Sequence, residues 1–126
     1  MNLNHINLTF ADIPAARHFF EKYFDFKVSD PKPNDALSVL TGENGVILVL
    51  MNERMNEDGN NGYPDNFHIG FYLESEKEVD EIYEKLKTGM EPVGERPKNM
   101  RKTYGFYIKF QRVLIEITTA NVRVGQ

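Results

Sequence analysis

The sequence contains no cysteine among its 126 residues. This absence excludes disulfide bonds, thiolate metal sites and a cysteine nucleophile. The chain also lacks any run of about 18 apolar residues, the length that a membrane-spanning helix requires. It has no excess of basic residues, because the net charge is -4 and the isoelectric point is near 5.4. We therefore expect no nucleic-acid partner and no membrane association.

The first ten residues, MNLNHINLTF, lack the basic start and the apolar core of a signal peptide. On this basis we expect a cytoplasmic protein. The composition that is present, with 40% hydrophobic and 27% charged residues, is usual for a globular chain. A chain of this length suits one compact domain, residues 1–126, with a core that needs no disulfides.

The order of the predicted secondary-structure elements repeats once along the chain. The first half contains a strand, a helix and three further strands, at residues 3–10, 12–24, 25–29, 36–41 and 45–51. The second half contains the same series, at residues 67–73, 75–89, 90–95, 103–110 and 112–119. The polar segment 52–66 interrupts all periodicity and predicts a linker. The sequence therefore predicts an α+β fold of unit one (1–51), linker and unit two (67–119).

Both predicted helices have clear boundary signals. Asp12 is a good N-cap, and Pro14 lies in the first turn. Ser75 and Glu78 form a capping box, and Gly89 predicts the end of the second helix. The apolar stripes that should face the sheets are Ile13, Ala16, Phe20 and Phe24 in the first helix, and Val79, Ile82 and Leu86 in the second.

Each half carries one histidine at the same place on its first strand. His5 precedes the cap Asp12 by the same interval that separates His68 from the cap Ser75. A repeated unit of this size indicates that neither half buries its sheet alone. If the helices cover one face of the sheets, the opposite face is left for another purpose.

Alternation along three strands places metal-capable side chains on that opposite face. In FHIGFYL (67–73), the phenylalanines, isoleucine and leucine share one face, and His68 lies on the other. His5 on the first strand and Glu116 on the last have the same orientation relative to their apolar neighbours. Two imidazoles and one carboxylate suit an open site for a divalent first-row metal. The alternative is a solvated Glu116 and two unrelated histidines, and the repeat favours the metal site.

Three segments, LNHINLTFADIPAARHFFEKYF, FHIGFYL and VLIEI, resemble the vicinal oxygen chelate superfamily, and the resemblance covers residues 1–119. This group includes glyoxalase I, the fosfomycin-resistance enzymes, extradiol dioxygenases and bleomycin-binding proteins. The resemblance implies two βαβββ units whose curved sheets form a central cup with the helices outside. It also implies a divalent metal (manganese, iron, nickel or zinc) that chelates adjacent oxygens of a small-molecule substrate.

The resemblance further implies a homodimer with shared sites. In such a dimer, His5 of one chain completes a metal site with His68 and Glu116 of the other. Laying GVILVLM (45–51) over RVLIEIT (112–118) places Val49 opposite Glu116, whereas glyoxalase I is similar but has a glutamate at both places. Glyoxalase I chemistry is therefore disfavoured, and the three-ligand pattern is closer to the fosfomycin-resistance enzymes.

Two catalytic candidates follow from the same resemblance. Tyr107 matches a tyrosine that the fosfomycin-resistance enzymes place near substrate, and Asn7 stands where the thiol transferases have a threonine. The chain departs from those enzymes in KNMRKTYG, which replaces their monovalent-cation loop, and in KFQRV, which shortens the turn before the last strand. No general base is identifiable.

Two functions of different class therefore remain open. One is a metal-dependent lyase, isomerase or transferase that acts on a small oxygen-rich molecule. The other is a metal-free binding protein of the bleomycin-resistance type. His18 is predicted to be solvated on its helix. The basic loop 94–103 either reaches over an anionic substrate or forms a solvated turn, and its cations are Arg96, Lys98, Arg101 and Lys102.

Overall fold

The computed structural model describes residues 1–30, 32, 34–57, 62–90 and 94–120. The chain divides into two compact units, Met1–Gly62 and Tyr63–Gln126. Each unit has a mixed sheet of four strands and one long helix, which confirms the predicted α+β class. Within the described ranges, no helix is both long and apolar enough to cross a membrane.

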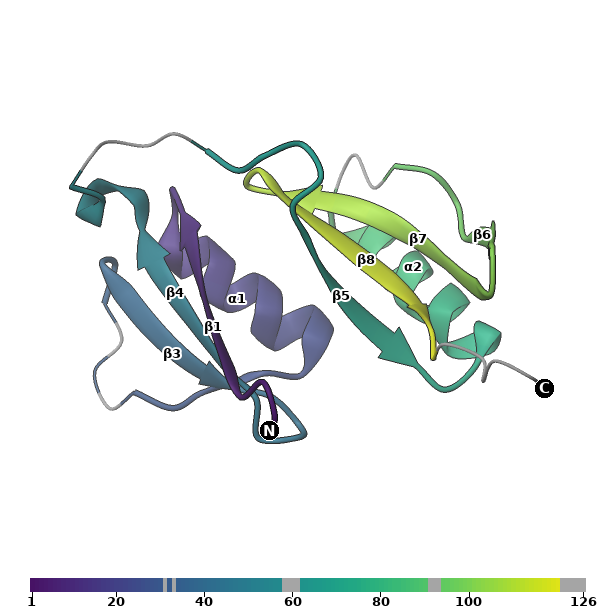
Figure 1. Cartoon of the computed structure of the whole chain (residues 1–126), viewed down its shortest axis with the longest axis horizontal. Helices are drawn as coiled ribbons and strands as arrows, with labels where there is room; N and C mark the ends of the chain where they lie inside the picture. The colour runs from purple at the N-terminus through teal and green to yellow at the C-terminus, as the bar shows by residue number, and fades with distance from the viewer. Residues whose placement is uncertain (31, 33, 58–61, 91–93, 121–126) are drawn as a thin grey trace. The chain divides into compact units, whose positions relative to one another are not determined.

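Unit 1 contains a sheet with the strand order β1-β4-β3-β2. Its strands are β1 (His5–Phe10), β2 (Lys27–Val28), β3 (Leu37–Thr41) and β4 (Ile47–Asn52). β1 runs parallel to β4, and the other neighbours are antiparallel. Helix α1 (Ile13–Phe24) packs against β4, β3 and β2, and Figure 1 shows it behind β1. A short 3-10 helix, η1 (Glu53–Met55), follows β4 inside the segment predicted as a linker.

Unit 2 repeats this connectivity with the strand order β5-β8-β7-β6. Its strands are β5 (His68–Leu73), β6 (Lys98–Met100), β7 (Thr103–Phe110) and β8 (Val113–Thr119). β5 is parallel to β8, as β1 is to β4. Helix α2 (Glu76–Gly89) packs against β7, β8 and β5, and Figure 1 shows it behind β7. In both units one face of the sheet is thus covered by the unit's own helix.

The predicted helix starts are confirmed by hydrogen bonds. Asp12 Oδ1 accepts from the Ala15 N–H at 3.0 Å, and Ser75 Oγ accepts from the Glu78 N–H at 3.2 Å. The predicted end of the second helix is also confirmed. Gly89 is the last residue of α2, and the backbone of the following Met90 is extended, with φ of -153°.

The buried helix faces are wider than the predicted stripes. Phe24 and Ile82 are only half-buried, whereas Phe19, Tyr23 and Tyr83 are buried. Aromatic packing explains the width in unit 1, where the Phe19 ring meets the Phe20 ring edge-on with centroids 5.1 Å apart. The helix therefore covers the sheet with a broad face of several neighbouring side chains, and not with a single row.

The segment between α2 and β7 differs from its prediction. A strand was expected at 90–95, but residues 91–93 lie outside the described residues, and β6 is found at Lys98–Met100. The shortened turn before the last strand is present: β7 and β8 are joined by Gln111 and Arg112 alone, with φ of 44° and 74°. Two positive φ values are typical of the type I′ hairpin turn, which fits the twist of the strands.

Candidate metal site

The uncovered face of the unit 2 sheet carries the predicted polar side chains. Along β8, Val113, Ile115 and Ile117 are buried toward α2, so Glu116 points to the opposite face. β5 alternates in the same sense, with His68 exposed, although its helix-facing residues are only half-buried. Strand pairing then brings Tyr107 of β7 directly opposite Glu116. Three side chains from three adjacent strands therefore meet on one face.

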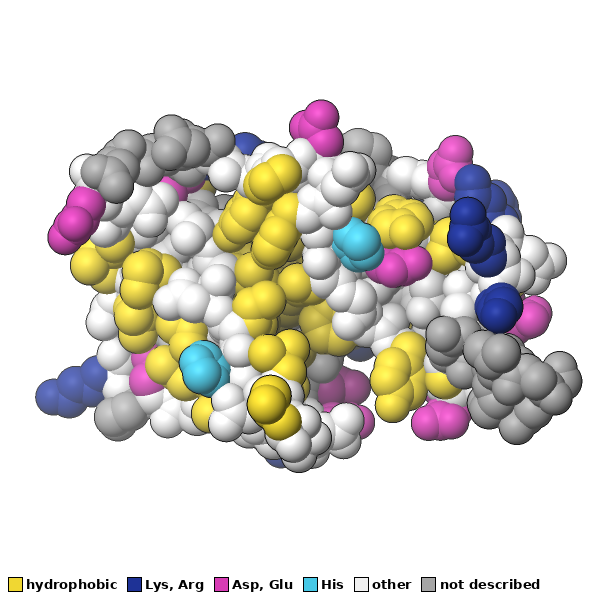
Figure 2. Space-filling model, viewed as in Figure 1, with side chains coloured by type: hydrophobic (Ala, Val, Ile, Leu, Met, Phe, Trp, Pro, Cys, Tyr) yellow, Lys and Arg dark blue, Asp and Glu magenta, His cyan; other side chains and the backbone are white. Residues whose placement is uncertain are grey.

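The two carboxylate oxygens of Glu116 have different neighbours. The Tyr107 hydroxyl donates a hydrogen bond to Glu116 Oε2 at 3.0 Å. His68 Nε2 lies 3.5 Å from Glu116 Oε1. Figure 2 shows the surface coloured by residue type, with one histidine (cyan) next to an acidic side chain (magenta) in the right-hand half of the view. Gly70, the strand partner of Glu116 on β5, has no side chain that could cover the carboxylate.

The hydrogen bond at His68 Nδ1 determines which ring nitrogen carries the hydrogen. The other nitrogen, Nε2, faces the Glu116 carboxylate. His68 Nδ1 lies 3.0 Å from the backbone carbonyl oxygen of Asn66. A carbonyl oxygen can only accept, so Nδ1 carries the hydrogen, and in the neutral imidazole Nε2 has its lone pair free. Metal-binding histidines are commonly oriented in this way by a backbone carbonyl.

The distance between the two facing donor atoms fits a shared cation. A lone pair on His68 Nε2 and a negative Glu116 oxygen repel each other unless a proton or a metal ion lies between them. Two ligand atoms bound tetrahedrally to one zinc-sized ion at about 2.1 Å lie about 3.4 Å apart, close to the observed 3.5 Å. The donor set is also the imidazole and carboxylate combination that divalent first-row metals accept.

Tyr107 acts as a hydrogen-bond donor at neutral pH. Burial raises the pKa of its hydroxyl above the ordinary 10.0, and the hydrogen bond to Glu116 and the charge of Glu116 raise that pKa further. A group whose pKa is raised on folding contributes its stability below the unfolded value, near pH 10. That contribution is lost as the pH rises through the higher folded pKa. Tyr107 is thus suited to orient Glu116 and not to serve as a base.

Unit 1 carries the other predicted site residues on the corresponding face. His5 and Asn7 are exposed on β1, on the side away from the buried Leu8 and Phe10. In the strand register, Asn7 pairs with Val49, just as Gly70 pairs with Glu116 in unit 2. Val49 therefore occupies the position in unit 1 that Glu116 occupies in unit 2, in agreement with the sequence overlay.

The structure brings together only part of the predicted triad within one unit. His68 and Glu116 meet in unit 2, while His5 belongs to unit 1. Among the residues that the structure describes, no group of three or more histidine or acidic side chains forms a metal cluster. His18 is exposed on α1, as predicted.

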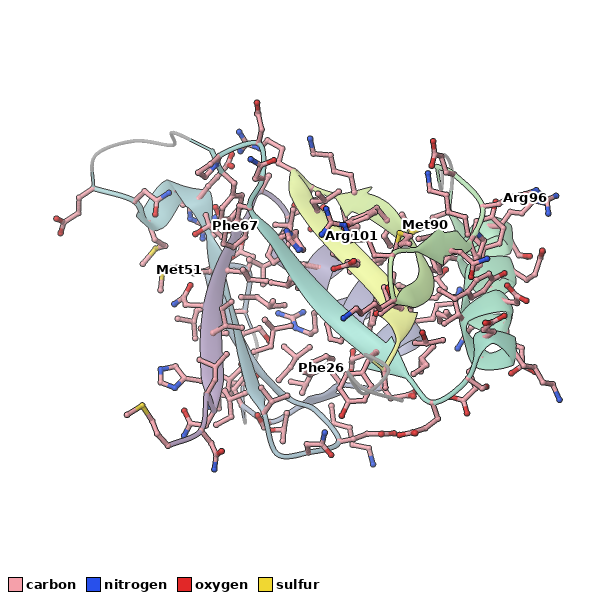
Figure 3. All side chains as sticks on the ribbon, turned by 45° about the vertical axis from the view of Figure 1, so that its right-hand side comes forward. Phe26, Met51, Phe67, Met90, Arg96 and Arg101 are labelled. Atoms are coloured by element: carbon pink, nitrogen blue, oxygen red, sulfur yellow. The ribbon has the colours of Figure 1, made fainter. Side chains whose placement is uncertain are left out.

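The basic loop is partly neutralised by its own residues. Lys98 Nζ forms an ion pair with Glu95 Oε2 at 2.7 Å, which lowers the pKa of the Glu95 carboxyl. The Arg96 side chain extends outward at the right-hand end of unit 2 in Figure 3. A cation that the sequence analysis missed is Lys109, which follows Tyr107 by two residues on β7 and so shares its face. The alternation of TYGFYIKF was the signal for it.

The chain matches one protein family over most of its length. The profile of the Glyoxalase/Bleomycin resistance protein/Dioxygenase superfamily matches residues 2–116. A comparison with functionally curated proteins gave no match.

Solved structures of similar fold were also found. A structure described as a possible glyoxalase from Bacillus cereus is 38% identical, with a TM-score of 0.79, and the match covers 94% of this chain and 98% of that one. The genomically encoded fosfomycin resistance protein FosX from Listeria monocytogenes is 25% identical, with a TM-score of 0.71 and coverage of 96% and 92%. Lactoylglutathione lyase from Agrobacterium tumefaciens is 21% identical, with a TM-score of 0.74 and coverage of 99% and 97%, and shares the fold.

Proposed function

Because the chain belongs to the Glyoxalase/Bleomycin resistance protein/Dioxygenase superfamily, the vicinal oxygen chelate proteins, we propose that it is a metal-dependent enzyme. Its reaction is that of a lyase, isomerase or transferase on a small oxygen-rich molecule, closest to the fosfomycin-resistance type. The observation that carries this proposal is the His68–Glu116 pair, whose facing donor atoms lie 3.5 Å apart on the uncovered sheet face. The similarity to FosX is consistent with this type.

Three side chains would hold the metal: His68 and Glu116 from unit 2, and His5 from unit 1. Manganese, iron, nickel or zinc are the candidate ions, and a bound ion of this kind supplies Lewis acidity toward neighbouring oxygens of the substrate. The Asn66 carbonyl keeps His68 Nε2 unprotonated in the neutral ring. Tyr107 holds one oxygen of Glu116, so the other oxygen stays directed toward His68.

Two residues of unit 1, Val49 and Asn7, define how a substrate would reach the metal. With valine at position 49, the site has three protein ligands and not four, so coordination positions remain for substrate oxygens. Asn7 is exposed on the same face of β1 as His5 and is the second catalytic candidate after Tyr107. A carboxamide at this position can donate a hydrogen bond to a substrate oxygen and accept one from a hydroxyl.

The proposed function is tested by metal binding. Protein purified without chelator, and then offered manganese, nickel and zinc in turn, is expected to bind about one divalent ion per chain. Isothermal calorimetry and metal analysis after gel filtration measure this stoichiometry. If none of the three ions binds, the enzyme proposal is wrong, and the metal-free binding protein of the bleomycin-resistance type takes its place.

We further propose that the chain forms a homodimer with shared sites, in which His5 of one chain joins His68 and Glu116 of its partner. Two-fold symmetry then gives two equal sites. Proteins carrying His5→Ala and His68→Ala should each lose metal binding when refolded alone. Refolded together, they should regain about one intact site per mixed dimer, because one site collects both defects. Mixed dimers that form without recovering metal binding would show that the sites lie within single chains.

A further inference from the structure

Lys109 lies on the same sheet face as the candidate metal site. In the strand register it is opposite Leu114, and Leu114 is opposite His68 on its other side. The three residues form one row across β5, β8 and β7. His68 and Lys109 are thus two strand spacings apart, about 10 Å between Cα atoms. The preceding Ile108 is buried toward α2, so alternation directs Lys109 to the uncovered face.

The ammonium group of Lys109 has no partner in the part of the chain that the structure describes. The side chain is exposed, and it makes no hydrogen bond or ion pair with a described residue. Lys98 differs, because Glu95 already neutralises it at 2.7 Å. A free lysine on a strand can simply lie over an apolar neighbour such as Leu114 with its charge in water. Because Lys109 also lies in one row with His68, its ammonium group is close enough to the candidate metal site to contact a molecule bound there.

The balance of charge on this face favours an anion. Glu116 and Lys109 are the charged residues that β5, β7 and β8 direct to the uncovered face. Once a divalent ion is bound, the carboxylate of Glu116 offsets only half of the metal's charge, and Lys109 adds another positive charge. The phenol of Tyr107 adds no charge to this face, because an ordinary tyrosine hydroxyl is protonated at neutral pH. The face then carries a net positive charge that an incoming anion would reduce.

We infer that Lys109 is the residue that recognises an anionic group of the substrate, a carboxylate or a phosphonate, beside the metal. This inference rests on the proposed function and assigns its substrate class. The lysine stem spans only part of the distance to His68, so the anionic group must stand a few bonds from the chelating oxygens. The substrate is therefore a small anion with oxygen atoms near its charged end. With Lys109 in this role, loop 94–103 is not needed for anion recognition and fits the solvated turn, the second of the two alternatives that the sequence left open.

The test measures anion binding and needs no knowledge of the reaction. Zinc-loaded protein is titrated with acetate and with methylphosphonate, and binding is followed by the NMR shifts of the β5, β7 and β8 amides. Lys109→Met keeps the length of the side chain and removes its charge, and should weaken binding of the preferred anion about tenfold or more. Lys109→Arg should stay within about threefold of the wild type, since it keeps the charge. The preferred probe distinguishes a carboxylate from a phosphonate.

Lys102→Met is the matched control, because Lys102 is exposed in the turn between β6 and β7, at the opposite end of β7 from Lys109. Unchanged anion binding in this variant supports the assignment to Lys109. Equal binding by Lys109→Met and the wild type, or no binding of either anion by the wild type, overturns the inference. Failure to load any of zinc, manganese and nickel overturns the proposed function instead. In that case the same comparison on metal-free protein still decides whether Lys109 binds anions.

Discussion

Replacing Glu116 with alanine is expected to abolish binding of divalent metal. The substitution removes one of three proposed ligands and also leaves the Tyr107 hydroxyl without its acceptor. Loss of an outer partner of a metal ligand costs about 10- to 100-fold in affinity, so loss of the ligand itself should cost more than about 100-fold. His68→Ala should have an effect of the same size. Calorimetric titration with manganese, nickel and zinc measures both.

Glu81→Ala is the control for this experiment, because Glu81 is an exposed acidic residue on α2, outside the sheet face. It removes the same charge and should bind metal like the wild type. Circular dichroism and a melting curve show whether each variant is folded. A folded Glu116→Ala protein that binds metal with unchanged affinity would rule out Glu116 as a ligand and, with it, the site on unit 2.

Replacing Gly105 with alanine is expected to destabilise the protein by about 3 kcal/mol or more. Gly105 lies on β7 between Lys98 of β6 and Thr118 of β8. An added Cβ atom would overlap the carbonyl oxygen of Ile117 and lie 2.7 Å from the Cα of Thr118. Since both are backbone atoms of a paired strand, β7 and β8 would have to separate. Urea denaturation measures the free energy of unfolding.

Gly70→Ala is the matched control for this substitution. Gly70 also lies in a strand of the unit 2 sheet, but an added Cβ there meets only Glu116, with Oε1 at 3.7 Å and the backbone oxygen at 3.9 Å. These are ordinary contacts, so the free energy of unfolding should change by less than about 1 kcal/mol. Equal stability of the two variants would contradict the close approach of β7 and β8.

The part of the fold that the sequence predicted rests on local and repetitive signals. The caps Asp12 and Ser75 and the strict alternation along β1 and β8 depend on neighbouring residues, and the structure confirms them. The equivalence of Val49 and Glu116 could be found because the chain contains its own second copy for comparison. Such patterns can be predicted from the sequence, because each one depends on residues of the same unit.

The features that were missed depend on contacts between segments distant in sequence. The position of β6 is set by its pairing with β7, where Lys98 lies opposite Gly105, and not by local propensity. The importance of Gly105 follows from the approach of Ile117, which no local pattern contains. The alternation of β7 could have placed Lys109 on the same face as Tyr107, but its position in one row with His68 depends on the pairing of β5, β8 and β7.

The matched register of β1–β4 and β5–β8 has an evolutionary consequence. If the two units arose by duplication of one ancestral half, the same strand position is present twice in the chain. In this chain one copy has Glu116 and the other has Val49, at equivalent pairing positions. Valine and glutamate codons can differ by a single base in the genetic code. Under the proposed function, a three-ligand and a four-ligand form of the site would therefore be separated by one point mutation at a position whose backbone is already in place.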